Sequence, residues 1–165
     1  MKLRKPALPP EVHDALDLRP KERVLAWADD GGGRAIVATE TALHLQRTPP
    51  AYTRLGWEQI EHATYEGGVM TITRVPELES ATLRVPVGDR RELPIAIRDR
   101  VTSSVVVDRF VPLKDDVGVH IVGRRSGSGE ITWRIDLDPH LAGDPESEAA
   151  AQSALDEVRA EVSSG

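Results

Sequence analysis

The side chains in this sequence whose types could do chemistry are histidines, a few serines and a run of arginines. The five histidines are His13, His44, His62, His120 and His140. No two of them have the i, i+2 or i, i+4 spacing that is typical of a metal site on one element. The sequence therefore predicts no metal or cofactor site. One alternative stays open, in which His44 and His62 approach across strands and are joined by Glu61 or Glu40.

A nucleophile for covalent catalysis is equally hard to find. The chain has no cysteine, and Ser103 and Ser104 are not surrounded by the strained G-x-S-x-G turn that exposes a catalytic serine. A catalytic triad would need a histidine and an acid from distant parts of the chain. We therefore expect that the protein is not an enzyme.

Two glycine-rich segments have the composition of phosphate-binding loops. They are DDGGGR at 29–34 and RRSGSGE at 124–130. Neither is followed by Lys-Ser/Thr or opens a predicted helix, so both are interpreted as hairpin turns. An alternative for the second is a backbone nest that holds an anion between Arg124 and Arg125.

Residues 90–134 form the locally basic part of the chain. Six arginines in or beside its predicted elements are candidate partner-binding or anion-binding residues: Arg98, Arg100, Arg109, Arg124, Arg125 and Arg134. On one face they would attract an acidic protein, an anionic lipid headgroup or a nucleic acid. The segment from Asp136 to the end has a net charge of −7. Pairing of the arginines with that acidic segment is the alternative, and we favour it.

Length and composition limit the class of protein. With 165 residues, of which 39% are hydrophobic, the chain suits one globular domain, 1–165. It has no apolar run near the ~20 residues that span a bilayer, and its start has no apolar signal-peptide core, so we expect a cytoplasmic protein. The net charge of −6 argues against non-specific nucleic-acid binding over the whole surface.

The elements that must position these residues are mostly short strands. Period-2 alternation, clearest in 131–137, and turn residues predict strands at about 23–29, 34–39, 42–47, 52–57, 60–66, 69–74, 80–85, 104–111, 117–125 and 131–137. Helices are predicted at about 10–18, 90–101 and 144–162.

The predicted helices have apolar stripes, and the tryptophans are expected in the core. In the second helix the stripe is Leu93, Ile97 and Val101. The third begins at Asp144-Pro145, a carboxylate cap followed by proline. Its stripe of Ala151, Leu155, Val158 and Val162 should lie against a sheet. The tryptophans are Trp27, Trp57 and Trp133.

The strand series from Glu22 to Thr73 resembles the PH-like and GRAM-type domains of bacteria. The likeness is carried by ERVLAWA at 22–28, VATETALHL at 37–45, RLGWEQIEHATYE at 54–66 and GVMTIT at 68–73. It includes a Thr-x-x-aliphatic hairpin turn from Thr39 and covers roughly residues 20–87. The whole chain also resembles a family of uncharacterised actinobacterial proteins of similar length.

The resemblance implies an α+β fold of mainly antiparallel strands, a bent barrel or sheet with a C-terminal capping helix. The helix at 144–162 fits the capping role, and residues 88–138 would add a helix and strands. Phosphoinositide-binding PH domains use Lys and Arg around the first hairpin, whereas Asp29 and Asp30 make this one acidic. We therefore predict a non-catalytic binding module for a protein partner. The alternatives are a binder of anionic ligands through the arginines, and a small-molecule carrier or enzyme that uses the barrel interior.

Overall fold

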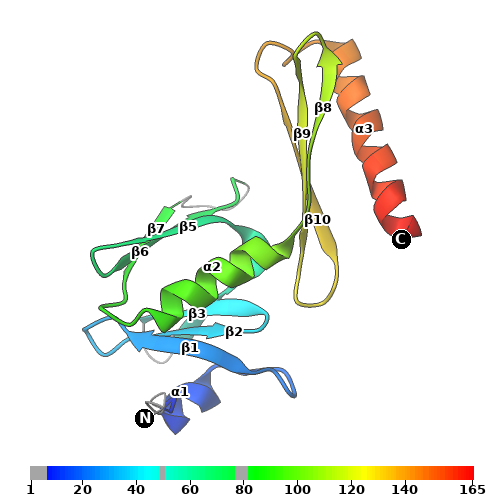
Figure 1. The fold of residues 1–165 in the computed structure, drawn as a ribbon. Helices are drawn as coiled ribbons and strands as arrows, with labels where there is room; N and C mark the ends of the chain where they lie inside the picture. Colours follow the sequence, from blue (N-terminus) through cyan, green and yellow to red (C-terminus); the bar gives the residue numbers. More distant parts are fainter. Residues whose placement is uncertain (1–6, 49–50, 77–81) are drawn as a thin grey trace. The chain divides into compact units, whose positions relative to one another are not determined.

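The computed structural model describes residues 7–48, 51–76 and 82–165. It confirms an α+β fold of antiparallel strands with a C-terminal helix (Figure 1). The helical elements are α1 (Pro10–Ala15), the 3-10 turn η1 (Trp57–Gln59), α2 (Glu92–Ser104) and α3 (Pro145–Ser164). The strands are β1 (Val24–Asp29), β2 (Ala35–Thr39), β3 (Ala42–Thr48), β4 (Ala51–Gly56), β5 (Ile60–Glu66), β6 (Val69–Arg74), β7 (Thr82–Pro86), β8 (Val105–Lys114), β9 (Val117–Arg125) and β10 (Ile131–Leu137).

The predicted elements are confirmed with small shifts at their ends. The largest are three residues each: the 10–18 helix ends at Ala15, the 90–101 helix extends to Ser104 and the 104–111 strand extends to Lys114. Ser80 and Ala81, placed in the 80–85 strand, lie outside the described residues. The described strands form three separate sheets, and none of these sheets closes into a barrel.

The chain divides into two compact units. Unit 1 comprises Met1–Ser104 with Ser126–Gly129, and unit 2 comprises Val105–Arg125 with Glu130–Gly165. The division follows the packing, because each unit has its own cluster of buried hydrophobic side chains.

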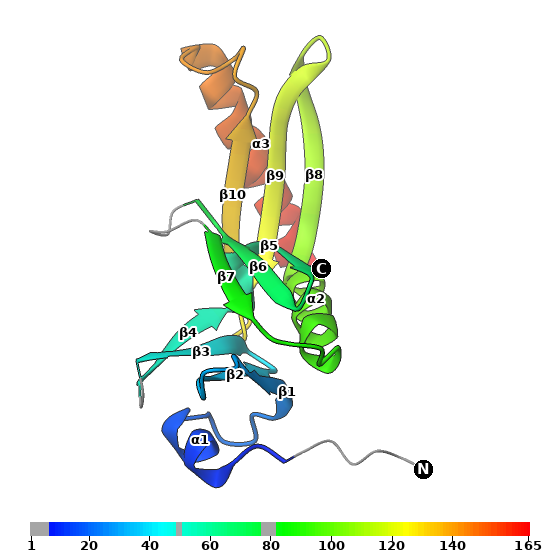
Figure 2. The same ribbon diagram turned by 90° about the vertical axis from the view of Figure 1, so that its left-hand side faces the viewer.

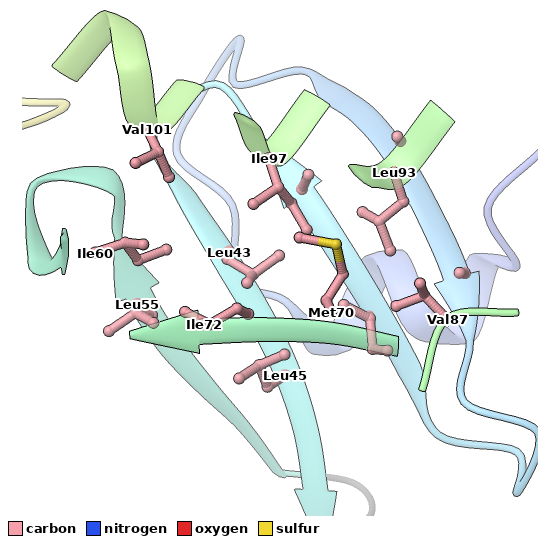
Figure 3. Close-up of a cluster of buried hydrophobic side chains, with 14 of the residues drawn as sticks. Leu43, Leu45, Leu55, Ile60, Met70, Ile72, Val87, Leu93, Ile97 and Val101 are labelled. Carbon is pink, nitrogen blue, oxygen red and sulfur yellow. The ribbon is translucent and has the colours of Figure 1, made fainter. Parts of the chain in front are cut away.

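The main core of unit 1 is formed by two sheets and α2. The sheets have the orders β1-β2-β3-β4 and β5-β6-β7. Leu43 and Leu55 of the first sheet, Ile72 of the second and Ile97 of α2 meet in one cluster (Figure 3). Alternation along the strands explains this, since every second side chain of β3 and β6 points to the same side.

The helix that packs on this core is α2. Leu93, Ile97 and Val101 all lie in the core, as their spacing predicts, and α2 contacts β1 and β5. The helix at 144–162 lies against a sheet, as its apolar stripe predicts. That sheet is the one in unit 2, because consecutive elements of the chain pack together there.

The β1–β4 sheet is buried on its second face as well. Leu16 follows α1 and is buried with Ala35 and Val37 of β2, and the half-buried Trp27 and Tyr52 pack against them. All five residues of β2 are buried as a result, which is the continuous apolar pattern of a strand covered on both faces.

Unit 2 is one sheet covered by one helix. The strand order is β10-β9-β8, and α3 lies along one face of all three strands (Figures 1 and 2). Val119 and Ile121 of β9 are fully buried against Ala151, Leu155 and Val158 of α3. The half-buried Trp133, Ile135 and Leu137 complete this core from β10. The period-2 prediction for β10 is therefore confirmed.

The start of α3 is built as predicted. The Asp144 carboxylate accepts the Ser147 backbone N–H at 3.3 Å and the Ser147 hydroxyl at 2.5 Å, and Pro145 occupies the first turn. The hydroxyl contact holds the pKa of Asp144 below its usual value. Among the described residues, no helix is long and apolar enough to cross a lipid bilayer.

Candidate interaction surface

The face of the β8–β10 sheet opposite α3 is the candidate site, and we call it the open face. Unit 2 consists of three strands and α3, and α3 covers only the other face. Strand alternation places the following side chains on the open face: Asp108, Phe110 and Pro112 of β8, His120, Val122 and Arg124 of β9, and Thr132, Arg134 and Asp136 of β10. Figure 2 views the sheet from the side opposite α3.

An exposed aromatic side chain stands on the open face. Phe110 is 54% exposed, although its neighbours Val107 and Val111 on the other face of β8 pack into the core. Val122 lies half-buried on the central strand, one register row from Phe110. Exposed apolar side chains beside polar ones are typical of binding surfaces, and aromatic residues are enriched among those that dominate binding energy.

The charges of the open face are arranged in pairs. His120 Nε2 forms a close hydrogen bond with Asp108 Oδ1, across β9 and β8. Arg134 donates to Asp136 Oδ1 from Nε at 3.0 Å and from Nη2 at 2.9 Å, along β10. Because His120 and Arg134 each have an acid beside them, these charges do not form a field of one sign. Phosphate-rich partners require such a field.

The structure divides the six predicted arginines between the two units. Arg98 and Arg100 belong to α2 in unit 1. Arg124 and Arg134 are on the open face, where the register makes them diagonal neighbours, because Arg124 pairs with Thr132. A single arginine patch of all six residues is therefore not seen within either unit.

The other two arginines of unit 2 point away from the open face or lie at its end. Arg109 is on the α3 side of β8 and donates to Glu161 Oε2 at 2.8 Å. The contact agrees with the favoured alternative, in which arginines pair with the acidic helix. An exposed ion pair of this kind contributes about 0–1 kcal/mol to the free energy of unfolding. Arg125 is exposed at the last position of β9, and it pairs with Ile131.

Carboxylates in the first hairpin loop accept hydrogen bonds from the backbone N–H groups of the same loop. Asp29 Oδ1 accepts Gly31 N–H at 2.7 Å, and Asp30 Oδ1 accepts Gly32 N–H at 2.8 Å. Arg34 pairs with Asp30 Oδ2 at 2.6 Å. The carboxylates occupy the donors that a phosphate would use in such a loop, which is the physical reason the DDGGGR segment is a turn.

A buried polar cluster lies on the α1 side of the β1–β4 sheet. Thr39 is fully buried and its hydroxyl donates to Glu22 Oε1 at 2.6 Å, while His44 Nε2 lies 3.5 Å from the same hydroxyl. Thr41 also donates to Glu22 Oε1, and Arg54 Nη2 donates to Thr41 Oγ1 at 3.3 Å. Thr39 and His44 are buried, whereas Glu22 and Thr41 are half-buried.

The same threonine explains the hairpin turn between β2 and β3. Thr39 Oγ1 accepts Ala42 N–H at 3.2 Å and so closes the turn between β2 and β3. The Trp57 indole N–H donates to the Thr39 carbonyl oxygen at 3.0 Å. This bond ties η1 to β2, and Trp57 is buried in the main core of unit 1, while the tryptophans at 27 and 133 are half-buried.

The cluster makes stability depend on pH in a defined direction. Burial lowers the pKa of His44 below 6.5, an effect that Glu22 opposes and Arg54 reinforces. Partial burial would raise the pKa of Glu22, but the hydrogen bonds from Thr39 and Thr41 hold it below its usual value. Both groups therefore bind protons less readily in the folded protein than in the unfolded chain.

We expect the free energy of unfolding of unit 1 to fall as the pH decreases below 6.5, toward the lower pKa of folded His44. Urea unfolding between pH 8 and pH 5 measures this slope. The Glu22 contribution is lost separately, below pH 4.5. In His44→Gln the slope between pH 7 and pH 5 should become smaller. Comparison at pH 8, where the imidazole is neutral in both states, removes the packing effect of the substitution. An unchanged slope would contradict a buried neutral His44.

The other predicted chemistry is not assembled by the fold. His44 lies in the β1–β4 sheet and His62 in the β5–β7 sheet, and no group of three metal-ligating side chains occurs among the described residues. Ser104 donates its hydroxyl to the Val101 carbonyl oxygen at 2.7 Å, as a serine near the end of a helix commonly does. At the 124–130 turn, the Ser126 and Ser128 hydroxyls are 2.8 Å apart.

No family model, curated protein or solved structure matches this chain.

Sequence reasoning missed Phe110 and the Glu22–Thr39–His44 cluster. Phe110 alternates with Arg109 and Val111 along β8, so the period-2 pattern shows that its side chain lies on the opposite face of the strand from theirs. The pattern does not show that this face is exposed. That exposure depends on α3 covering the opposite face. Glu22 and His44 are 22 positions apart and come together only through the pairing of β1, β2 and β3.

Proposed function

We propose that the protein is a non-catalytic protein-interaction module that binds its partner through the open face of unit 2. The observation that carries the proposal is Phe110, a 54% exposed aromatic side chain in a sheet whose other face is covered by α3. The charged residues around it are paired on the face itself. Apolar side chains beside polar groups are the ordinary composition of protein–protein interfaces.

Unit 1 serves in this proposal as a PH-like scaffold. Its support is the order of elements, in which four strands, three strands and then α2 pack around one core. The core is filled by hydrophobic side chains (Figure 3), so we do not place a ligand in this interior. Since the carboxylates of the first hairpin loop already accept the backbone N–H groups of that loop, we do not place a lipid headgroup there either.

The proposal is tested by site-specific photo-crosslinking in cells that produce the protein naturally. A photo-reactive phenylalanine analogue replaces Phe110 in one variant and Ile95 in another. Ile95 is a suitable control because it is 58% exposed on α2 and lies outside the open face. We expect a discrete adduct from position 110 that is lost when Val122→Asp is added. Absence of an adduct at 110, or an equal adduct at 95, would contradict the proposal.

A further inference from the structure

We propose that β10 is an association edge, at which β10 of a second copy of this chain adds in antiparallel orientation and joins the two β8–β10 sheets into one. The inference goes beyond the proposed function, because it concerns the edge of the sheet and not its open face. It is carried by the peptide groups that point out of β10 and by the order of side chains along this strand.

The backbone of β10 has one side that β9 does not use. β10 is the outermost strand of its sheet, and among the described residues it pairs with β9 alone (Figure 2). The Asp138 N–H donates to the Gly118 carbonyl oxygen at 2.9 Å. By alternation, the peptide groups of Asp136 and Arg134 also point toward β9. The residues between and beside them point their peptide groups outward, where another strand can pair with them: Trp133, Ile135 and Leu137.

The two edges of this sheet are not equivalent. Pro112 within β8 has no backbone N–H, and the register of β8 shifts near both of its ends. Prolines and bulges are the usual means by which an edge strand is protected from pairing. β10 contains neither proline nor glycine, and its register is unbroken from Ile131 to Leu137. β10 is therefore the edge that is open to strand addition.

The order of side chains selects a second copy as the strand that fits. Because outward peptide groups must meet each other, the two-fold axis passes through a pair of identical residues. Centring the pairing on Arg134 or on Asp136 places like charges directly opposite each other, which is destabilising. Centring it on Ile135 places Arg134 of each copy opposite Asp136 of the other. The order Trp-Arg-Ile-Asp-Leu at 133–137 is thus complementary to its own reverse.

The ion pair within β10 is retained in this register. Arg134 binds Asp136 of its own chain through Oδ1 in both of their contacts. The Asp136 side chain is 47% exposed, and its Oδ2 has no contact with the described residues, so it is accessible to the guanidinium of the other copy. The four groups then form a square in which each charge has an opposite charge beside it, both along its strand and across the interface.

The same register pairs all the outward peptide groups and extends the core. Ile135 meets Ile135, and Trp133 of each copy meets Leu137 of the other, with two backbone hydrogen bonds in each pair. On the α3 side these side chains are only half-buried, whereas Val119 and Ile121 of the central strand are fully buried. Pairing places the half-buried side chains of the two copies in contact, since directly opposite residues lie on the same face.

Sedimentation equilibrium of the full chain tests the proposal. One pair of strands is a small interface held mainly by backbone bonds, so we expect dimers at protein concentrations on the order of 10–100 μM. Arg134→Asp and Asp136→Arg should each weaken the dimer at least about tenfold, because each places like charges opposite each other at two symmetric positions. Circular dichroism verifies that each variant is folded.

Mixing the two variants separates the interface from effects within one strand. The Arg134→Asp chain has acids at both positions and the Asp136→Arg chain has bases at both, so every cross-strand pair of a mixed dimer joins an acid to a base. We expect the mixed dimer to have a dissociation constant within about threefold of that of the unmodified chain. Arg91→Asp and Asp99→Arg, at exposed positions of unit 1, are the matched controls. Each should associate like the unmodified chain, and mixing them should change nothing.

Three results would overturn the inference. The first is a full chain that stays monomeric at the highest concentration. The second is a mixture of the Arg134→Asp and Asp136→Arg chains that associates no better than either chain alone. The third is an equal gain when the two control variants are mixed, because the attraction would then come from net charge and not from the register of β10.

Discussion

Ile97→Ala is expected to lower the free energy of unfolding of unit 1 by about 3–4 kcal/mol, within the range measured for buried isoleucine truncated to alanine. Ile97 is fully buried in α2, in the cluster that includes Leu43 and Ile72 of the two sheets. The substitution removes the transfer free energy of three carbons and leaves a cavity between α2 and the sheets. Urea unfolding followed by tryptophan fluorescence measures the effect. Trp133→Phe, in unit 2, restricts the signal to Trp57 and Trp27 of unit 1.

Ile95 provides a matched control for this prediction. It is the same residue type on the same helix, two positions away, and it is 58% exposed. Ile95→Ala should change the free energy of unfolding by no more than about 0.5 kcal/mol. Equal effects at 95 and 97 would mean that α2 does not pack on this core, and the assignment of α2 rather than α3 as its helix would be wrong.

Gly118→Ala is expected to destabilise unit 2 by about 3 kcal/mol, at the upper end of overpacking costs. A Cβ at position 118 would lie 2.0 Å from the Val111 carbonyl oxygen and 2.8 Å from the Pro112 Cα. Both contacts are with backbone, so no side-chain rotation can relieve them. They occur where the register between β8 and β9 shifts near Pro112. Thermal unfolding followed by Trp133 fluorescence reports the loss.

Gly32→Ala is the control for the glycine substitution. A Cβ at position 32 approaches the Asp30 carboxylate at 3.3 Å, and this side chain lies at the start of an exposed turn. The expected change is within about 0.5 kcal/mol. If Gly118→Ala were as mild as Gly32→Ala, the close approach of β8 to β9 at this point would be incorrect.

Local patterns predicted most of the elements but not the contacts between them. The stripe of Leu93, Ile97 and Val101 showed that the second helix has one apolar side, and the alternation in 131–137 showed the same for β10. Neither pattern states which surface each side contacts. The stripe of the 144–162 helix predicted contact with a sheet, and only the fold shows that this sheet consists of β9 and its neighbours.

The candidate surface was less predictable than the fold, for a related reason. The six arginines attract attention in the sequence because charge is visible in composition. The fold places them on different units and faces, and it pairs Arg109 with Glu161. Phe110 gave no comparable signal, since an aromatic residue in a strand is ordinarily expected to be in the core.

The sequence by itself determined where the strands and helices run, which side of each is apolar, and that Asp144 begins the last helix. These properties depend on neighbours within a few residues, through side-chain alternation, helical spacing and capping. Only the tertiary structure decided the division into two units, the choice of α2 for the first core, the burial of His44 beside Glu22 and Thr39, and the open face around Phe110. Those properties depend on which distant surfaces are buried together, and many arrangements satisfy the same local pattern.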